Sequence, residues 1–173
     1  MKHFPFDYFP TPTWVSSFLV KQVNIKPSDV IIESSAGTGE LINSIKQAGG
    51  KNILSFEIVP QFQVTLAQQG ILVVSDNFLT YPNLSSSANV IIQNPPFSLQ
   101  LSFIYKAYQC LKKDGQLVSL MSNTPWRFNR PSYQRFKGWC ERVNAKVVEL
   151  PYGLFLNSTR PTSVNCYCLK IIK

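Results

Sequence analysis

The sequence predicts a single α/β domain with a doubly wound, mostly parallel sheet and a C-terminal antiparallel hairpin. Apolar segments of strand length alternate with segments of helical periodicity through about the first 120 of the 173 residues. The strand-like segments are apolar on both faces, which is typical of parallel strands covered by helices on each side. Two last strand-like segments, 146–150 and 164–172, predict the hairpin.

The elements alternate in chain order. Helices are expected in four segments with apolar residues at helical spacing: 14–23, 40–48, 61–69 and 102–111. Strands are expected in five short apolar segments: 29–32, 52–56, 71–74, 90–92 and 116–121. The glycine pair at 49–50 is a helix stop signal, and residues 112–115 are predicted to form a turn.

Composition restricts the class of protein. With 45% hydrophobic residues, the chain can form one well-packed core but not two comfortable domains. The net charge of +8 favours a polyanionic partner. The four cysteines form no C-x-x-C pair and there is one histidine, so a zinc site is poorly supported. Because neither a secretory leader nor a membrane-spanning stretch is visible, we expect a soluble cytoplasmic protein with reduced thiols.

Polar residues follow four of the predicted strands. Glu33 opens a turn that runs to Gly39, and Glu57, Asp76 and Asn94 follow the next three strands. Because the carboxyl ends of parallel strands meet at one edge of the sheet, we expect these segments to converge. Ligands of open α/β sheets bind at that edge, where the strand order reverses.

The segment 36–39 reads Ala-Gly-Thr-Gly and lies between a predicted strand and a predicted helix. Missing Cβ atoms there would let a ligand approach the backbone at a helix N-terminus, although an ordinary tight turn is an equal alternative. Glu57 lies 18 residues beyond Gly39, near the spacing at which a carboxylate accepts ribose hydroxyls. Glu57 and Asp76 could each be solvated residues, but together with the glycines they outline a nucleoside pocket.

The most specific motif is Asn94, Pro95, Pro96 and Phe97. Two prolines fix φ and remove two backbone donors, so the preceding strand must end at Gln93. The rigid turn holds an amide and an aromatic ring in fixed relation, which suits it to grip a planar, amino-bearing ring. A purely structural double-proline turn would need neither of these two side chains.

The segment 124–146 contains six basic residues and one acidic residue, Glu141, interleaved with aromatic side chains. Arginine beside aromatic rings suits phosphate contact combined with base stacking. A solvated helix with a buried aromatic face is the alternative. The candidates for nucleic-acid contact, with one more from the turn between the last two strands, are Trp126, Arg127, Phe128, Arg130, Arg135, Lys137 and Arg160.

Jointly, these motifs resemble the S-adenosylmethionine-dependent amino-methyltransferases, most closely the N6-adenine DNA methyltransferases with γ-type motif order. The resemblance covers nearly the whole chain and implies a Rossmann-like class I methyltransferase domain over 1–173, without a separate target-recognition domain. The segments similar to the family's cofactor and catalytic motifs are 8–15, 33–39, 56–58, 76–78 and 94–97. In two departures, Ser34 replaces the usual proline and Phe97 replaces the tyrosine common in DNA enzymes. Phenylalanine also occurs in members that act on RNA.

The resemblance implies a set of residues that bind S-adenosylmethionine: Thr11, Glu33, Ala36, Gly37, Thr38, Gly39, Glu57, Ile58, Asp76, Asn77, Phe78 and Asn94. It implies methyl transfer to the N6 amine of a flipped-out adenine in DNA, with Asn94, Pro95, Pro96 and Phe97 as catalytic residues. The Asn94 side-chain oxygen and the Pro95 carbonyl would accept hydrogen bonds from the amine, and Phe97 would stack on the base. No metal is required, because proximity and orientation supply most of the rate.

Three other functions stay open at this point. The acceptor could be a base in ribosomal RNA or a glutamine of a protein, or the chain could be a catalytically silent nucleic-acid-binding subunit. The basic, aromatic segment 124–146 weighs against glutamine and does not separate RNA from DNA. Target recognition is expected from that segment, or from a partner chain or second copy.

Overall fold

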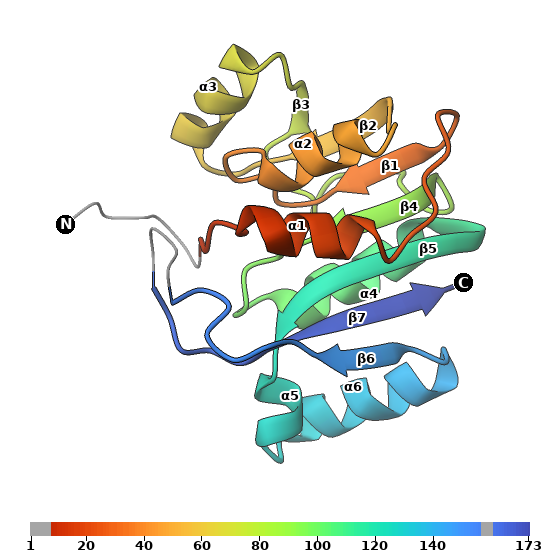
Figure 1. Cartoon of the computed structure of the whole chain (residues 1–173). Coiled ribbons are helices and arrows are strands. Elements are labelled where there is room, and N and C mark those ends of the chain that lie inside the picture. The colour runs from red at the N-terminus through yellow and green to blue at the C-terminus, as the bar shows by residue number, and fades with distance from the viewer. Residues whose placement is uncertain (1–7, 157–160) are drawn as a thin grey trace.

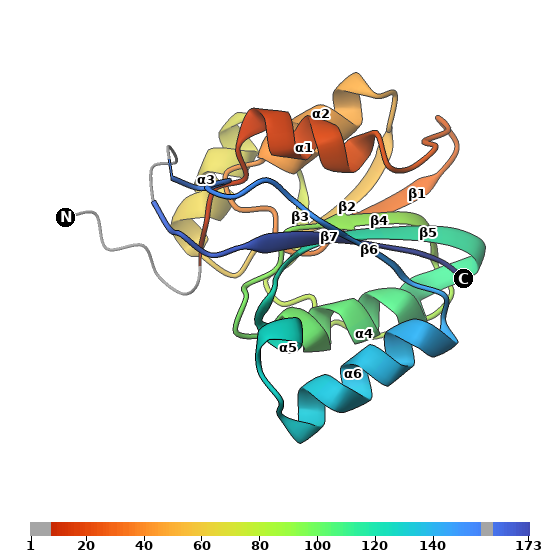
Figure 2. The same ribbon diagram turned by 60° about the horizontal axis from the view of Figure 1, so that its bottom comes forward.

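The computed structural model describes residues 8–156 and 161–173. Within them, one seven-stranded sheet has the order β3-β2-β1-β4-β5-β7-β6 (Figure 1). Helices cover both faces, with α1, α2 and α3 on one side and α4, α5 and α6 on the other (Figure 2). The elements are α1 (Thr13–Val20), β1 (Val30–Glu33), α2 (Glu40–Gln47), β2 (Asn52–Phe56), α3 (Pro60–Gln68), β3 (Val73–Ser75), β4 (Ala88–Gln93), α4 (Gln100–Cys110), β5 (Leu111–Ser122), α5 (Thr124–Arg127), α6 (Pro131–Arg142), β6 (Lys146–Glu149) and β7 (Cys166–Ile172).

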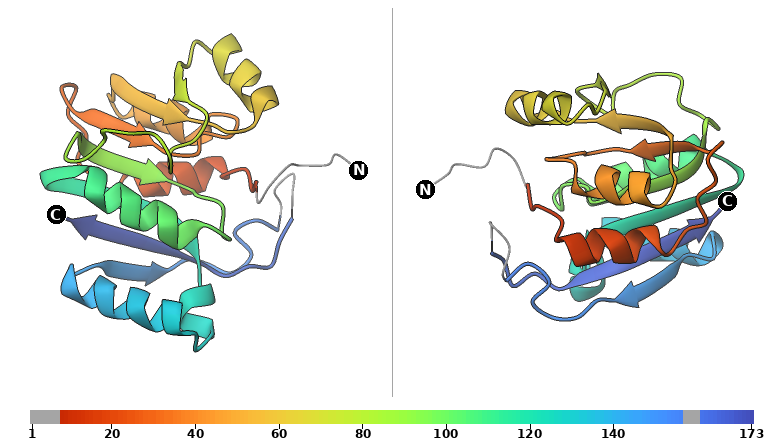
Figure 3. Two further views of the ribbon diagram at one scale, coloured as in Figure 1. Left: turned by 180° about the vertical axis from the view of Figure 1, so that it is seen from behind. Right: turned by 45° about the horizontal axis from the view of Figure 1, so that its top comes forward.

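The pairing of the strands confirms the predicted fold class. The strands β1 to β5 pair in parallel with their neighbours, while β7 runs antiparallel to both β5 and β6. The predicted C-terminal hairpin is therefore present, and its second strand is inserted between β5 and β6 (Figure 3). As predicted, β4 ends at Gln93, directly before the two prolines.

The prediction that 112–115 interrupts the sheet as a turn was wrong. The strand β5 already begins at Leu111, which pairs with Ala88, and the ladder resumes where Gln116 pairs with Val90. The residues between them bulge out of the β4–β5 ladder, and Asp114 adopts a φ of 62°. The bulge is held by the C-terminus, because the backbone N–H of Asp114 donates to the Lys173 carbonyl at 2.7 Å.

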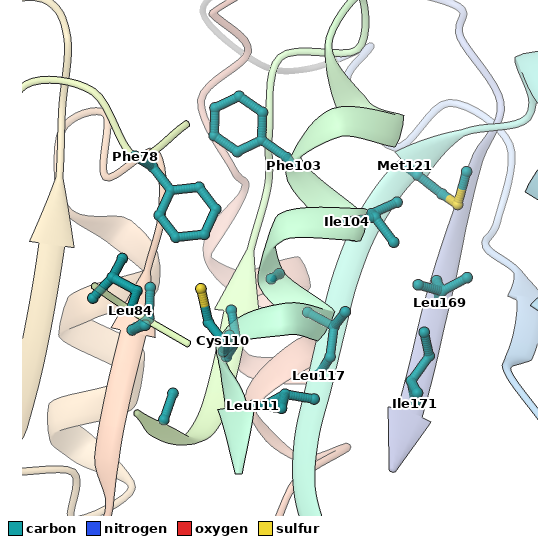
Figure 4. Close-up of a cluster of buried hydrophobic side chains, with 14 of the residues drawn as sticks. Phe78, Leu84, Phe103, Ile104, Cys110, Leu111, Leu117, Met121, Leu169 and Ile171 are labelled. Carbon is teal, nitrogen blue, oxygen red and sulfur yellow. The ribbon is translucent and has the colours of Figure 1, made fainter. Parts of the chain in front are cut away.

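The core consists of layers on the two faces of the sheet. Along β1, Ile32 faces the layer beneath α4, whereas Ile31 faces the layer beneath α1 and α2. Figure 4 shows the first layer, in which side chains of α4, β5 and β7 meet. This alternation explains why the strands are apolar on both faces.

All four cysteines are buried and free, and burial raises the pKa of the Cys140 and Cys166 thiols to about 12.

The strand order reverses between β1 and β4. From β1 the chain moves outward through β2 and β3, and it then returns to the other side of β1 for β4. The carboxyl ends of β1 and β4 therefore flank the crevice at which open α/β sheets bind ligands. No helix within the described residues is both long and apolar enough to cross a bilayer.

Candidate active site

A cavity of about 430 Å³ opens at the carboxyl ends of the strands, a size typical of small-molecule sites. Four strand ends and the N-terminal segment contribute to its wall. It brings together most of the residues predicted to bind a cofactor: Thr11, Ala36, Gly37, Glu57, Ile58, Asp76, Asn77, Phe78 and Asn94. Pro96 also lines the cavity, whereas five other predicted residues are not part of its wall: Glu33, Thr38, Gly39, Pro95 and Phe97.

Several residues of the cavity wall were not named individually as site residues from the sequence, although Tyr8, Phe9, Ser34 and Ser35 lie within the segments 8–15 and 33–39. They are mostly apolar or hydroxyl-bearing: Tyr8, Phe9, Ser34, Ser35, Leu41, Val59, Phe62, Leu79, Ser98, Leu99 and Phe103, together with Glu40. Ser98 and Leu99 follow the catalytic motif directly, so that motif could have been extended to include them. The isolated apolar residues carry no signal that distinguishes a cavity wall from ordinary core.

The glycine turn requires its glycines. Gly37 and Gly39 have φ values of 56° and 98°, a region that disfavours side chains. A Cβ atom on Gly37 would lie 2.7 Å from the ring of Tyr8. The Thr38 hydroxyl donates to Glu40 Oε1 at 2.6 Å, so the hydroxyl of Tyr8, 2.7 Å away, donates to Thr38. The N-terminal segment is thereby joined to the glycine turn.

The carboxylate of Glu57 braces the same turn. Its two oxygens accept hydrogen bonds from the backbone N–H groups of Gly37, at 2.6 Å, and Val59, at 2.7 Å. Burial raises the pKa of Glu57, and these hydrogen bonds oppose the shift. Each carboxylate oxygen can accept a second hydrogen bond, so Glu57 can stabilise the turn and still receive a ribose hydroxyl.

The carboxyl group of Glu33 is fully buried at the start of the turn. Its Oε2 accepts from the Ser35 N–H at 3.2 Å, but no donor among the described residues reaches Oε1. Burial, and then the nearby charge of Glu57, raise the pKa of Glu33 well above its ordinary value. A buried acceptor without a donor is costly, so Glu33 lowers the stability of the free protein.

The motif at 94–97, predicted to be catalytic, is connected to two other parts of the site. The Nδ2 of Asn94 donates to the Phe9 carbonyl at 3.1 Å and to the Thr11 hydroxyl at 2.9 Å. The backbone carbonyl of Asn94 accepts from the Ser35 hydroxyl at 3.1 Å. The motif, the glycine turn and the N-terminal segment therefore form one hydrogen-bonded unit.

The ring of Phe97 packs within an aromatic group. It stacks on Phe9 with 5.5 Å between centroids and an interplanar angle of 20°. Phe155, from the segment after β6, contacts it edge-on at 6.2 Å. One face of Phe97 is thus covered by Phe9, and its role in stacking on a target base stays a prediction.

Two buried glutamines, Gln93 and Gln100, form hydrogen bonds on either side of the motif at 94–97 in the sequence. Gln93 accepts from the Ser34 hydroxyl at 2.7 Å and donates to the Ser119 hydroxyl at 3.2 Å. Gln100, at the start of α4, exchanges two hydrogen bonds of 2.8 and 2.9 Å with Ser122. Ser34, which follows β1, therefore links the end of β1 to the end of β4 through its hydrogen bond with Gln93.

Lys106, in α4, stabilises the loop that follows β3 through hydrogen bonds to its backbone. The ammonium group donates to the carbonyls of Leu79 at 2.8 Å and Tyr81 at 2.7 Å, and lies 5.3 Å from the Phe78 ring centroid. Desolvation lowers the pKa of Lys106. The loop carries Asp76 and Phe78 into the cavity wall, so this contact fixes their position.

The residues predicted to contact nucleic acid divide into an exposed and a packed group. Arg127, Phe128 and Arg130, here called the α5 surface, are exposed, with both guanidinium groups within 6.0 Å of the Phe128 ring centroid. Trp126 instead packs edge-on against Phe136 and Tyr167, at 5.9 and 5.3 Å.

Three further candidates lie away from the α5 surface or cannot be placed. Arg135 is exposed and Lys137 half-buried along α6, whereas Arg160 lies outside the described residues. The α5 surface itself follows the carboxyl end of β5, next to β4 in the sheet. It therefore lies at the same edge of the sheet as Asn94.

No protein-family model and no curated protein matches the chain, but solved structures share its architecture. A type I restriction-modification methyltransferase subunit from Streptococcus thermophilus has a TM-score of 0.78 at 15% identity, covering 95% of this chain and 45% of that one. The fold is that of the S-adenosylmethionine-dependent methyltransferases. The chain thus spans less than half of the Streptococcus subunit.

Methyltransferases with quite different acceptors share this fold. The 23S rRNA methyltransferase ErmE has a TM-score of 0.69 at 14% identity, covering 96% of this chain and 70% of that one. Geranyl diphosphate methyltransferase in complex with S-adenosylmethionine has a TM-score of 0.67 at 13% identity, with coverages of 92% and 84%. A nucleic-acid base and a small molecule are both compatible with the fold, so the acceptor must be argued from the site.

Replacing Glu33 by Gln tests the burial of its charge. Because the folded-state pKa is raised, the wild-type protein loses stability as pH rises from the unfolded-state value, about 4.3, towards the folded-state value. The glutamine variant has no such loss, so its melting temperature relative to that of the wild type should increase as pH rises above about 4.3. Glu149→Gln, on exposed β6, is the control. If the difference in melting temperature between Glu33→Gln and the wild type does not change with pH, the raised pKa of Glu33 is contradicted.

Proposed function

We propose that this protein transfers a methyl group from S-adenosylmethionine to the exocyclic N6 amine of adenine in DNA. The observation that carries the proposal is that Asn94 and the glycine turn line one cavity at the switch point of a methyltransferase fold. An amide beside a cofactor-sized site is the arrangement needed to hold an amino nitrogen against a methyl donor. The resemblance of residues 94–97 to the catalytic motif of N6-adenine methyltransferases supports the same reaction.

The residues of the cavity fit the parts of S-adenosylmethionine. Gly37 is suited to its methionine portion, Glu57 to the ribose hydroxyls, and Asp76 with Phe78 to the adenine. Ile58, 45% exposed in the cavity wall, offers an apolar surface to the same ring. When bound, the cofactor supplies a methyl group on a sulfonium sulfur, which is an electrophile without further activation.

The protein's contribution to the reaction is to hold the target amine. The lone pair of an exocyclic adenine amine is delocalised into the ring, which makes it a poor nucleophile. Hydrogen bonds from that amine to the Asn94 side-chain oxygen and the Pro95 carbonyl would favour a pyramidal nitrogen with an available lone pair. As the carbon–nitrogen bond forms and the carbon–sulfur bond breaks, the surplus proton leaves to water. Orientation of the two reactants supplies most of the rate.

The α5 surface supports a nucleic acid rather than a protein or small-molecule acceptor. Two exposed guanidinium groups flank Phe128, itself 46% exposed, at the sheet edge that carries Asn94. Arginine supplies phosphate contacts, and an exposed aromatic ring supplies a stacking surface. We propose DNA rather than RNA for two reasons: the motif at 94–97 resembles that of N6-adenine DNA methyltransferases, and a type I restriction-modification methyltransferase subunit shares the fold. A partner chain or second copy is proposed to supply target recognition.

An RNA base is the second candidate substrate. Phe97 in place of tyrosine favours it, since phenylalanine also occurs in methyltransferases that act on RNA. An rRNA methyltransferase is also among the proteins that share this fold.

The decisive experiment incubates the protein with S-adenosylmethionine labelled in its methyl group and with separate DNA, RNA and protein pools. We expect label in DNA, recovered after digestion to nucleosides as N6-methyl-2′-deoxyadenosine. The Asn94→Ala variant should lose methyl transfer by at least about a hundredfold, because it removes an acceptor used in the transition state, and should still bind the cofactor. Label in RNA would select the second candidate. Full activity of Asn94→Ala would overturn the catalytic assignment.

Substitutions at Asp76 and Glu57 should separate cofactor binding from stability. Asp76 is exposed at the cavity wall, so Asp76→Ala should weaken cofactor binding by about tenfold and leave the melting temperature unchanged. Glu57→Ala should weaken binding and also cost about 1–3 kcal/mol of stability, because the N–H groups of Gly37 and Val59 lose their acceptor. Calorimetry measures the first effect and thermal unfolding the second. Equal stability of the two variants would contradict the brace assigned to Glu57.

The double variant Arg127→Gln, Arg130→Gln tests the α5 surface. If each guanidinium contacts one phosphate, the slope of log binding constant against log salt should fall in magnitude by about 2. The matched control is Arg142→Gln, which removes an exposed arginine at the opposite end of α6. An unchanged slope in the double variant would remove this surface from the proposed interface.

A further inference from the structure

The orientation of the Asn94 amide is determined by its surroundings. A carbonyl oxygen has lone pairs and no proton, so the atom of Asn94 that lies 3.1 Å from the Phe9 carbonyl must be the nitrogen. The reversed amide would place two acceptor oxygens against each other. The flip of this side chain is therefore fixed by a backbone group, which no side-chain substitution at Phe9 removes.

Thr11 provides the second acceptor. Its hydroxyl lies 2.9 Å from Asn94 Nδ2, and the Thr11 side chain is buried. An amide nitrogen carries two hydrogens, and the Phe9 carbonyl and the Thr11 hydroxyl receive one each. The hydrogen-bonding group that Asn94 can still offer to a target is its oxygen, which is an acceptor only.

The segment that carries these acceptors is itself held in place. The ring of Phe9 stacks on Phe97 and contacts Phe155 at 5.8 Å, while Tyr8 contacts the ring of Phe62 at 4.4 Å. Thr11 directly precedes the Pro12 cap of α1, whose carbonyl accepts from the Val15 N–H. The two acceptors are thus positioned before a target arrives, which is what preorganisation of a catalytic group requires.

We propose that the Phe9 carbonyl sets the polarity of the Asn94 amide and that the Thr11 hydroxyl holds the amide in place, so that the site presents an acceptor and selects a target nitrogen that carries hydrogen. Thr11 is then a positioning residue for methyl transfer, a role different from the cofactor contact that the motif resemblance implies. The inference rests on the proposed function, because it concerns the target side of the same site. A ring nitrogen without hydrogen, or a carbonyl oxygen, would meet lone pairs and be rejected.

Replacing Thr11 by Val tests this role with little change in volume. With one acceptor removed, the amide is held by the Phe9 carbonyl alone, so its side chain is less firmly positioned and its oxygen is less often aimed at the target. We expect kcat for methyl transfer to fall by about tenfold, the scale of one hydrogen bond, with the cofactor dissociation constant unchanged within about twofold. Thr11→Ser keeps the hydroxyl and should restore kcat. Thr13→Val, at an exposed threonine two residues further on, should behave as wild type.

A measurement that needs no turnover examines the amide directly. In the free protein, the two side-chain Nδ2 protons of Asn94 should exchange slowly with solvent by NMR, and Thr11→Val should accelerate their exchange. Unchanged exchange and unchanged kcat in Thr11→Val would overturn the inference. So would a loss of cofactor affinity with kcat retained, which would make Thr11 a cofactor residue. If the wild-type protein labels no pool, the proposed function fails, while proton exchange still decides whether Thr11 holds the amide.

Discussion

Everything at the site depends on where β4 stops. Pro95 and Pro96 supply no backbone donors, so the ladder cannot continue past Gln93, and the chain must leave the sheet beside β1. The parallel register pairs Ile32 with Ile91, which brings the residues after β1 level with those after β4. The glycine turn and the catalytic motif are neighbours for this reason, although about 55 residues separate them in the sequence.

The position of the site at a strand switch point has an energetic consequence. Two carboxyl groups, Glu33 and Glu57, and the amide of Gln93 are buried at the edge of a close-packed core. Each amide atom of Gln93 has a hydrogen-bond partner, whereas Glu33 retains an orphaned oxygen and a raised pKa. A buried polar group that lacks a partner reduces the stability of the free protein. The edge of the sheet that carries the site is therefore also a place where the fold is locally destabilised.

Much of the fold and site could be predicted because the signals are local. The double proline predicts the end of β4, the glycines predict the positive φ angles of the turn, and alternating apolar segments predict the parallel sheet. What could not be predicted depends on pairs far apart in the sequence. The Phe9 carbonyl is a backbone atom without a sequence signal, and the bulge in β5 is held by Lys173. The contacts of Trp126 with Phe136 and Tyr167, residues 10 and 41 positions away, have no local sequence signal either.

On the proposed function, cofactor and target share one cavity between β1 and β4. An NMR titration of the isotopically labelled protein with S-adenosylhomocysteine examines that shared cavity. We expect saturable shifts of the Gly37 and Asp76 backbone amides and of the Asn94 side-chain amide, with the amides of α6 unchanged. Absence of binding, or shifts confined to residues away from the carboxyl ends of β1 to β4, would contradict this proposal.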